Sequence, residues 1–198
     1  MITVKPVIDD VKEYQRGDLP ENAVKLNTPG SIDEMFRAAA PIAAVLVALL
    51  FAVMLIKTRL SDTRIVSFPA IAIGFLIGFV LLAVHEWLHA IVYPKDASVT
   101  IGKLKGKLLF VALASYPLTR RRFVVMCLLP FVLGILPLAV FVFSPAENRV
   151  LNGLMFGMAS VGMVSPYFDV YNVIAVLKQS SKTDKIMFFE DDLYRIAE

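Results

Sequence analysis

Residues 38–56 read AAAPIAAVLVALLFAVMLI and contain no charged or hydrogen-bonding side chain. A helix of about 20 such residues is long enough to cross the ~30 Å hydrocarbon core of a membrane. A helix on the surface of a water-soluble protein keeps a polar face, and this stretch has none. We therefore interpret it as a transmembrane helix and not as part of a large soluble helical core.

Three further stretches are nearly free of charge and reach the same length: 65–93, 123–143 and 150–177. Hydrophobic residues make up 58% of the 198-residue chain and charged residues 19%, whereas soluble domains have roughly 45–50% and 25%. The sequence therefore predicts an all-α membrane protein with four transmembrane helices. These spans define one membrane domain over residues 38–177.

Lysine and arginine are distributed unevenly between the two sides of the predicted spans. Five precede the first span, seven lie in the loop 94–122 and four follow the last span, which leaves four of the 20 for the other side. Basic residues are retained on the cytoplasmic side of membranes. We therefore predict an integral multi-pass protein of the cell membrane. Its N-terminal segment 1–37, its loop 94–122 and its tail 178–198 would be cytoplasmic.

The loop 94–122 has two strand-like stretches, 99–101 and 108–111, separated by Gly102 and Gly106. A small β-hairpin is one interpretation. A basic loop that lies on anionic lipid headgroups is the other, and the sequence leaves both open. Before the first span, Ser31 and Glu34 have the spacing of a capping box, which predicts a helix start there.

Residues 85–89 read His-Glu-Trp-Leu-His, an HExxH pattern near the end of the second span, and the chain has no other histidine. Residues four apart lie on one face of a helix, so His85 and His89 can bind one zinc ion. Glu86 follows the first ligand and is the candidate catalytic base, able to accept a proton from water and pass it to the leaving amine.

Asp169 is the other acidic residue within the apolar spans. Ionisable groups at membrane depth are costly and are functional by default. Counting helix rise from the span ends places His85 and Asp169 at a similar depth of about 12 Å. Catalytic zinc sites commonly have three protein ligands, so Asp169 is the natural third ligand. Pro166 predicts a kink or opening of the last span. Asn172 shares a face with Asp169 and is a candidate for an oxyanion or ligand-supporting role.

The HEWLH helix, the four-span layout and the Ser-Pro-x-x-Asp segment at 165–169 resemble the "putative zincin peptidase" membrane family. They are more distantly similar to the site-2 intramembrane proteases. The resemblance covers about residues 60–180. It implies a membrane-embedded zinc peptidase whose metal is held by His85, His89 and Asp169, with Glu86 as the base. Val170 stands where the site-2 pattern has a glycine after the aspartate.

The predicted function is therefore zinc-dependent hydrolysis of peptide bonds near the cytoplasmic face, in membrane-anchored or cytosolic peptide substrates. A non-enzymatic zinc scaffold or a subunit of a partner complex is the alternative. Hydrogen bonding to neighbouring helices is the simplest structural role for the two histidines, and it also remains open for Asn172. Nucleic acid is not an expected partner, because no stripe of interleaved aromatic and basic residues is present. The sequence does not indicate an oligomeric state.

Overall fold

The computed structural model describes residues 1–107 and 109–197. Leu108, which begins the second strand-like stretch, lies outside the described residues. The chain divides into two compact units. We call the first the sheet unit; it contains Met1–Ala39, Glu86–Leu129 and Phe168–Glu198. We call the second the helical unit; it contains Ala40–His85 and Pro130–Tyr167.

Four helical segments are long and apolar enough to cross a membrane: Asp33–Arg59, Phe68–Ala90, Arg120–Phe143 and Arg149–Gln179. This confirms the prediction of a mostly helical chain with four such helices. The boundary between the two units falls inside each of the four segments. Each segment therefore contributes one end to the helical unit and the other end to the sheet unit.

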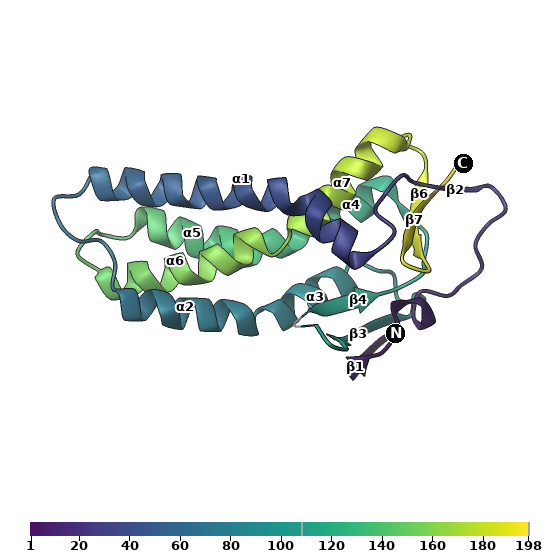
Figure 1. The fold of residues 1–198 in the computed structure, drawn as a ribbon, viewed down its shortest axis with the longest axis horizontal. Coiled ribbons are helices and arrows are strands. Elements are labelled where there is room, and N and C mark those ends of the chain that lie inside the picture. The colour runs from purple at the N-terminus through teal and green to yellow at the C-terminus, as the bar shows by residue number, and fades with distance from the viewer. Residues whose placement is uncertain (108, 198) are drawn as a thin grey trace. The chain divides into compact units, whose positions relative to one another are not determined.

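Short interruptions divide three of these segments into separate helices (Figure 1). The helices are α1 (Ile32–Arg59), α2 (Phe68–Val80), α3 (Leu82–Ala90), α4 (Arg120–Leu128), α5 (Val132–Phe143), α6 (Arg149–Val164) and α7 (Tyr167–Gln179), with 3-10 turns η1 (Val11–Glu13) and η2 (Leu129–Phe131). The break predicted at Pro166 is confirmed, because α6 ends two residues before it and α7 begins directly after it. The helix start at Ser31 is also confirmed, since its Oγ accepts a hydrogen bond from the Glu34 N–H at 3.3 Å.

Glycines allow α2 and α6 to pack at very short range in the helical unit (Figure 1). Each helix carries two glycines four residues apart: Gly74 and Gly78 on α2, Gly153 and Gly157 on α6. A Cβ atom at Gly74 would lie 2.2 Å from the carbonyl oxygen of Leu154, and one at Gly157 would lie 2.3 Å from that of Ile71. Such spacing of small residues lets helix backbones approach closely in membranes.

A polar cluster joins α1 to the ends of α5 and α6 in the same unit. The Lys57 ammonium donates to the backbone carbonyls of Phe141 and Ser144 and to Oδ1 of Asn152. Asn152 is fully buried. The carbonyls at the end of α5 have no partner within their own helix, so Lys57 satisfies them and places its charge at the negative end of the helix dipole.

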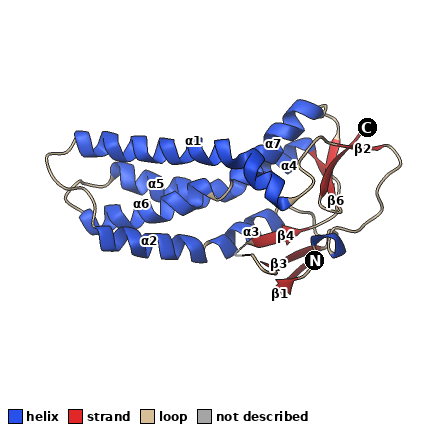
Figure 2. Cartoon of the chain, in the orientation of Figure 1, coloured by secondary structure: helices blue, strands red, loops and turns tan. Residues whose placement is uncertain are grey.

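The first sheet of the sheet unit has the order β1-β3-β4, with β1 at Ile2–Ile8, β3 at Val99–Leu104 and β4 at Phe110–Leu113. β1 is parallel to β3, and β3 is antiparallel to β4 (Figure 2). The β-hairpin interpretation of the 94–122 loop is therefore confirmed. Gly106 has a φ of 74° in its turn, a conformation that glycine adopts at little cost. β4 is an edge strand of this sheet.

The second sheet has the order β2-β7-β6-β5, with β2 at Ala23–Lys25, β5 at Leu118–Thr119, β6 at Lys185–Phe189 and β7 at Asp192–Ile196. β6 and β7 form a hairpin whose turn residues, Glu190 and Asp191, have φ values of 47° and 73°. Gln15 accepts hydrogen bonds from both turn N–H groups, at 3.1 and 3.2 Å. The all-α expectation is therefore incomplete, because the N-terminal segment supplies one strand to each sheet and the C-terminal tail supplies two to the second.

Candidate metal centre

His85 and His89 lie one turn apart on α3, and both are buried, with 6% and 8% of their surface exposed. Nδ1 of His89 lies 2.9 Å from the carbonyl oxygen of Met126. A carbonyl can only accept, so this nitrogen carries a proton, and in the neutral imidazole Nε2 then keeps the lone pair that a metal needs. Nδ1 of His85 lies 3.4 Å from Oγ of Ser165. Outer partners of this kind orient metal-binding imidazoles.

Asp169 lies in the first turn of α7, directly after the break at Pro166. Its Oδ1 is 3.5 Å from Nε2 of His89, the ring nitrogen that does not contact Met126. One ligand atom from each of His85, His89 and Asp169 lies within 4.8 Å of the others. The structure therefore brings together the three residues that the sequence nominated as metal ligands.

The similar depths that the sequence predicted for His85 and Asp169 do not explain why the two residues lie close together. The second apolar segment ends at Ala90, five residues after His85, whereas the last ends at Gln179, ten residues after Asp169. Because α7 is a separate helix after Pro166, counting rise from the end of the segment does not give the depth of Asp169.

The donor set fits a zinc ion, and so does the spacing of one donor pair. Zinc binds imidazole nitrogen and carboxylate oxygen at about 2.0–2.2 Å, and two such atoms on a tetrahedral ion are separated by roughly 3.3–3.5 Å. The distance between His89 Nε2 and Asp169 Oδ1 is 3.5 Å. Two imidazoles and one carboxylate also leave one of four tetrahedral positions open, as in catalytic zinc sites.

Glu86 follows His85 on α3 and is half-buried. Its carboxylate also accepts a hydrogen bond from the backbone of Ala112, in the edge strand β4. The candidate base is thus tied to the edge of the first sheet. Asn172 lies three residues after Asp169 on α7 and is half-buried. Its role toward a metal or substrate stays a prediction.

Sequence reasoning did not identify the outer partners of the site. The partner of His89 is a backbone carbonyl, at Met126, and a side-chain pattern carries no signal for it. Ala112 likewise contributes a backbone group. Ser165 does have a signal, because it is a hydroxyl residue beside Pro166 and four residues before Asp169.

Comparison with known families matches residues 78–183, more than half of the chain, to a family described as "Putative zincin peptidase". The chain belongs to this family. The matched region of this zincin family member begins in α2, includes all of α3 with its HEWLH motif, and extends beyond α7 with Asp169. Family membership supports a zinc metallopeptidase in general. No curated protein and no solved structure matches the chain.

Proposed function

We propose that the chain is a membrane-embedded zinc metallopeptidase that hydrolyses peptide bonds near the cytoplasmic face of the membrane. The observation that carries this proposal is the meeting of His85, His89 and Asp169 within 4.8 Å. Glu86, adjacent on α3, adds a carboxylate outside this group, which a purely structural zinc site has no need of.

The roles of the residues follow from their chemistry. His85 and His89 would hold zinc through Nε2, oriented by Ser165 and the Met126 carbonyl, and Asp169 would complete the ligand set. When bound, zinc supplies Lewis-acid activation of water and of the scissile carbonyl. Glu86 would take a proton from the attacking water and return it to the leaving amine. Asn172 would support Asp169 or donate to the oxyanion.

The edge strand β4 provides a place for the substrate. The Glu86 carboxylate reaches the backbone of Ala112, so the proposed base lies at this strand. An extended peptide can add to an exposed sheet edge through main-chain hydrogen bonds. A peptide held beside β4 would present its backbone next to Glu86. Such a substrate is either the unwound end of a membrane-anchored segment or a peptide delivered from the cytosol.

The location near the cytoplasmic face is supported by the charge distribution and by the helix ends. Arg120, Arg121 and Arg122 open the third apolar segment, and basic residues flank membrane spans on the cytoplasmic side. His89 is the next-to-last residue of the second segment. His89 therefore lies next to the segment end that leads into the basic loop 94–122.

The test combines zinc content with peptide cleavage on protein purified in detergent. We expect Glu86→Gln to retain zinc and to lose about 10²–10⁴-fold in turnover of a fluorogenic peptide library, because an amide cannot accept the proton. His85→Ala and Asp169→Ala should lose zinc affinity as well as activity. Glu147→Gln, which changes an exposed carboxylate, is the matched control and should behave as wild type.

Three results would count against the proposal in different ways. Unchanged cleavage by Glu86→Gln would remove the catalytic assignment. Full zinc binding by both His85→Ala and Asp169→Ala would remove the metal site itself. A wild-type protein that binds zinc and cleaves no peptide would instead favour the non-enzymatic scaffold.

A further inference from the structure

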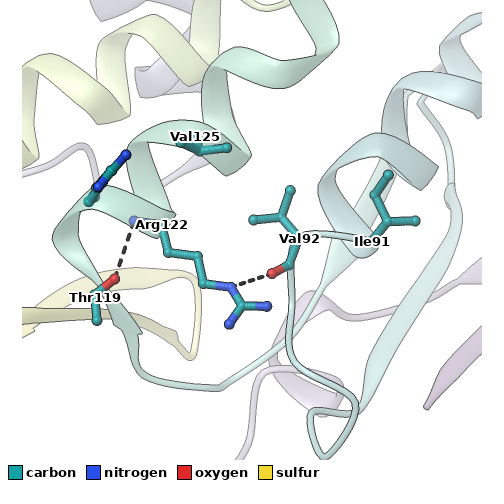
Figure 3. Close-up of a pocket in the computed structure, with 6 residues that line it drawn as sticks. Ile91, Val92, Thr119, Arg122 and Val125 are labelled. Atoms are coloured by element: carbon teal, nitrogen blue, oxygen red, sulfur yellow. Dashed lines mark hydrogen bonds between the residues drawn. The ribbon is translucent and has the colours of Figure 1, made fainter.

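A pocket of about 380 Å³ opens in the sheet unit between the residues that follow α3 and the first turns of α4 (Figure 3). Its walls combine aliphatic side chains, one hydroxyl and two guanidinium groups, from Ile91, Val92, Thr119, Arg121, Arg122 and Val125. The pocket is distinct from the candidate metal centre, since none of its lining residues belongs to the proposed ligand set. A cavity lined by two arginines and by aliphatic residues fits an amphiphilic anion.

Internal hydrogen bonds hold one of the two arginines in place. Nε of the Arg122 side chain donates to the carbonyl oxygen of Val92 at 2.5 Å, and the backbone N–H of Arg122 donates to Oγ1 of Thr119 at 3.3 Å (Figure 3). With Nε engaged, the terminal nitrogens of Arg122 remain to bind a ligand. The guanidinium fork suits phosphate oxygens better than a lysine would.

No carboxylate neutralises the two arginines through a described ion pair. Within residues 1–107 and 109–197, the ion pairs involve other cations. Asp96 is an acidic residue whose pKa is lowered mainly by the Tyr116 hydroxyl, which donates to it at 2.7 Å, and to a smaller extent by the charge of Arg122. The arginine charge is therefore largely available to an external anion.

The pocket lies where two membrane segments end. Val92 and Ile91 directly follow the second apolar segment, and Arg121 and Arg122 belong to the first turn of the third. Ile91 is 58% exposed and Val125 is 48% exposed. Along one wall, therefore, cationic groups at a membrane boundary adjoin apolar surface. A phospholipid has the matching arrangement, with an anionic phosphate next to an apolar acyl chain.

From these observations we infer that the pocket binds the phosphate group of an anionic membrane phospholipid, with the acyl chain along the aliphatic wall. Basic pockets between transmembrane helices on the cytoplasmic side recognise such headgroups. The N-terminus of α4 adds a favourable dipole for an anion. This inference does not depend on the proposed peptidase activity.

Occupancy of this pocket would also affect the elements that hold His89. Val92 donates its N–H to the His89 carbonyl at 3.2 Å, and Met126, on α4, accepts from the His89 imidazole. A lipid phosphate that bridges the end of α3 and the start of α4 would hold these two elements together. Lipid binding is thus expected to stabilise the fold around His89.

The experiment compares phosphatidylglycerol with phosphatidylcholine in mixed micelles of neutral detergent. Lipid retention is read by native mass spectrometry and the unfolding temperature by a thermal ramp. We expect saturable retention of phosphatidylglycerol that raises the unfolding temperature, with little effect of phosphatidylcholine. Arg121→Gln should weaken phosphatidylglycerol binding about five- to tenfold, as expected for one interfacial cation and its charge-assisted hydrogen bonds.

Matched controls distinguish a specific binding site from general electrostatic attraction. Arg149→Gln removes an equal charge from the start of the last apolar segment and should bind phosphatidylglycerol as wild type. Arg121 is exposed, so its variant should melt normally in phosphatidylcholine micelles. Equal loss in Arg121→Gln and Arg149→Gln would overturn the inference, as would equal retention of phosphatidylcholine. If millimolar inorganic phosphate displaced the lipid and gave the same stabilisation alone, the ligand would be soluble phosphate and the lipid assignment would be wrong.

Discussion

Replacing Gly157 by alanine should force α2 and α6 apart. The new Cβ would lie 2.3 Å from the carbonyl oxygen of Ile71 and 2.8 Å from the backbone nitrogen of Phe75. Ordinary van der Waals contact begins near 3.4 Å. Both opposing atoms are backbone and cannot rotate away, so the two helices must separate by about 1 Å at this point.

Two effects of opposite sign set the stability change. Alanine is favoured over glycine within a helix by about 1 kcal/mol. Overpacking costs typically 1–3 kcal/mol, and a contact with backbone on both sides belongs at or above the upper end. The steric effect therefore exceeds the gain in helix propensity. We expect a net destabilisation of about 2 kcal/mol.

The same displacement should reach the metal site. The Leu81 N–H bonds to the Ile77 carbonyl and the His85 N–H to that of Leu81, so helical bonding continues from α2 to His85. Ser165, at the end of α6, lies 3.4 Å from the His85 imidazole. Separation of α2 from α6 would stretch this contact. Loss of an outer partner typically lowers metal affinity 10–100-fold, and we expect at least tenfold here.

The assay measures unfolding temperature and zinc affinity on the same detergent-solubilised protein, the latter by competition with a chromophoric chelator. Gly30→Ala is the control, because a Cβ at Gly30 meets nothing within 4 Å. If Gly157→Ala matched Gly30→Ala in both measurements, the close approach of α2 and α6 would not determine the position of His85. A loss of stability with unchanged zinc affinity would refute only the coupling to the site.

Two further predictions concern pH and orientation. Hydrogen bonds from Ser181 are the main reason that the pKa of Asp184 lies below its ordinary value of 3.8. The ionised Asp184 carboxylate therefore stabilises the folded protein above pH 4, and this contribution is lost as pH falls through the folded-state pKa. Asp184→Asn should therefore unfold at a lower temperature than wild type at pH 7, and the difference should shrink towards pH 3; parallel pH profiles would contradict this. Single cysteines at Lys105 and Glu147 should react with an impermeant thiol reagent from opposite sides of the membrane, with position 105 on the cytoplasmic side. Cys127 is fully buried and should not react. Labelling of position 105 from outside would reverse the orientation.

The helices and the candidate metal ligands could be predicted because their signals are local or very strong. An uninterrupted apolar run such as 38–56 indicates a membrane helix without reference to any other part of the chain. The HEWLH motif places both histidines on one helical face. Asp169 stood out because a carboxylate is rare in such surroundings. The break at Pro166 follows from the missing N–H of one residue.

Apart from the β3–β4 hairpin, the sheets could not be predicted, because β1 and β2 pair with strands that are distant in sequence. Val4 of β1 pairs with Ile101 of β3, and Val24 of β2 pairs with Arg195 of β7. Short strands of mixed polarity carry a weak local signal, and nothing in their composition identifies the partner. The glycine pairs of α2 and α6 can be read directly from the sequence. Their function as a contact surface depends on which helices meet, and the sequence alone does not give this.

The strands resolve a difficulty in assigning peptide hydrolysis to a helical membrane protein. A helical substrate has its carbonyls hydrogen-bonded within the helix, so it must be unwound before a scissile carbonyl can be attacked. Unwinding in an apolar layer leaves backbone groups without partners, at a cost of several kcal/mol each. In the sheet unit, Glu86, His89 and Asp169 belong to the same compact unit as β4, whose edge can replace the lost hydrogen bonds. Extended backbone is available there, in β4. On the proposed peptidase activity, preferred substrates would therefore be segments with low helix propensity close to the end of a membrane span, where unwinding costs least.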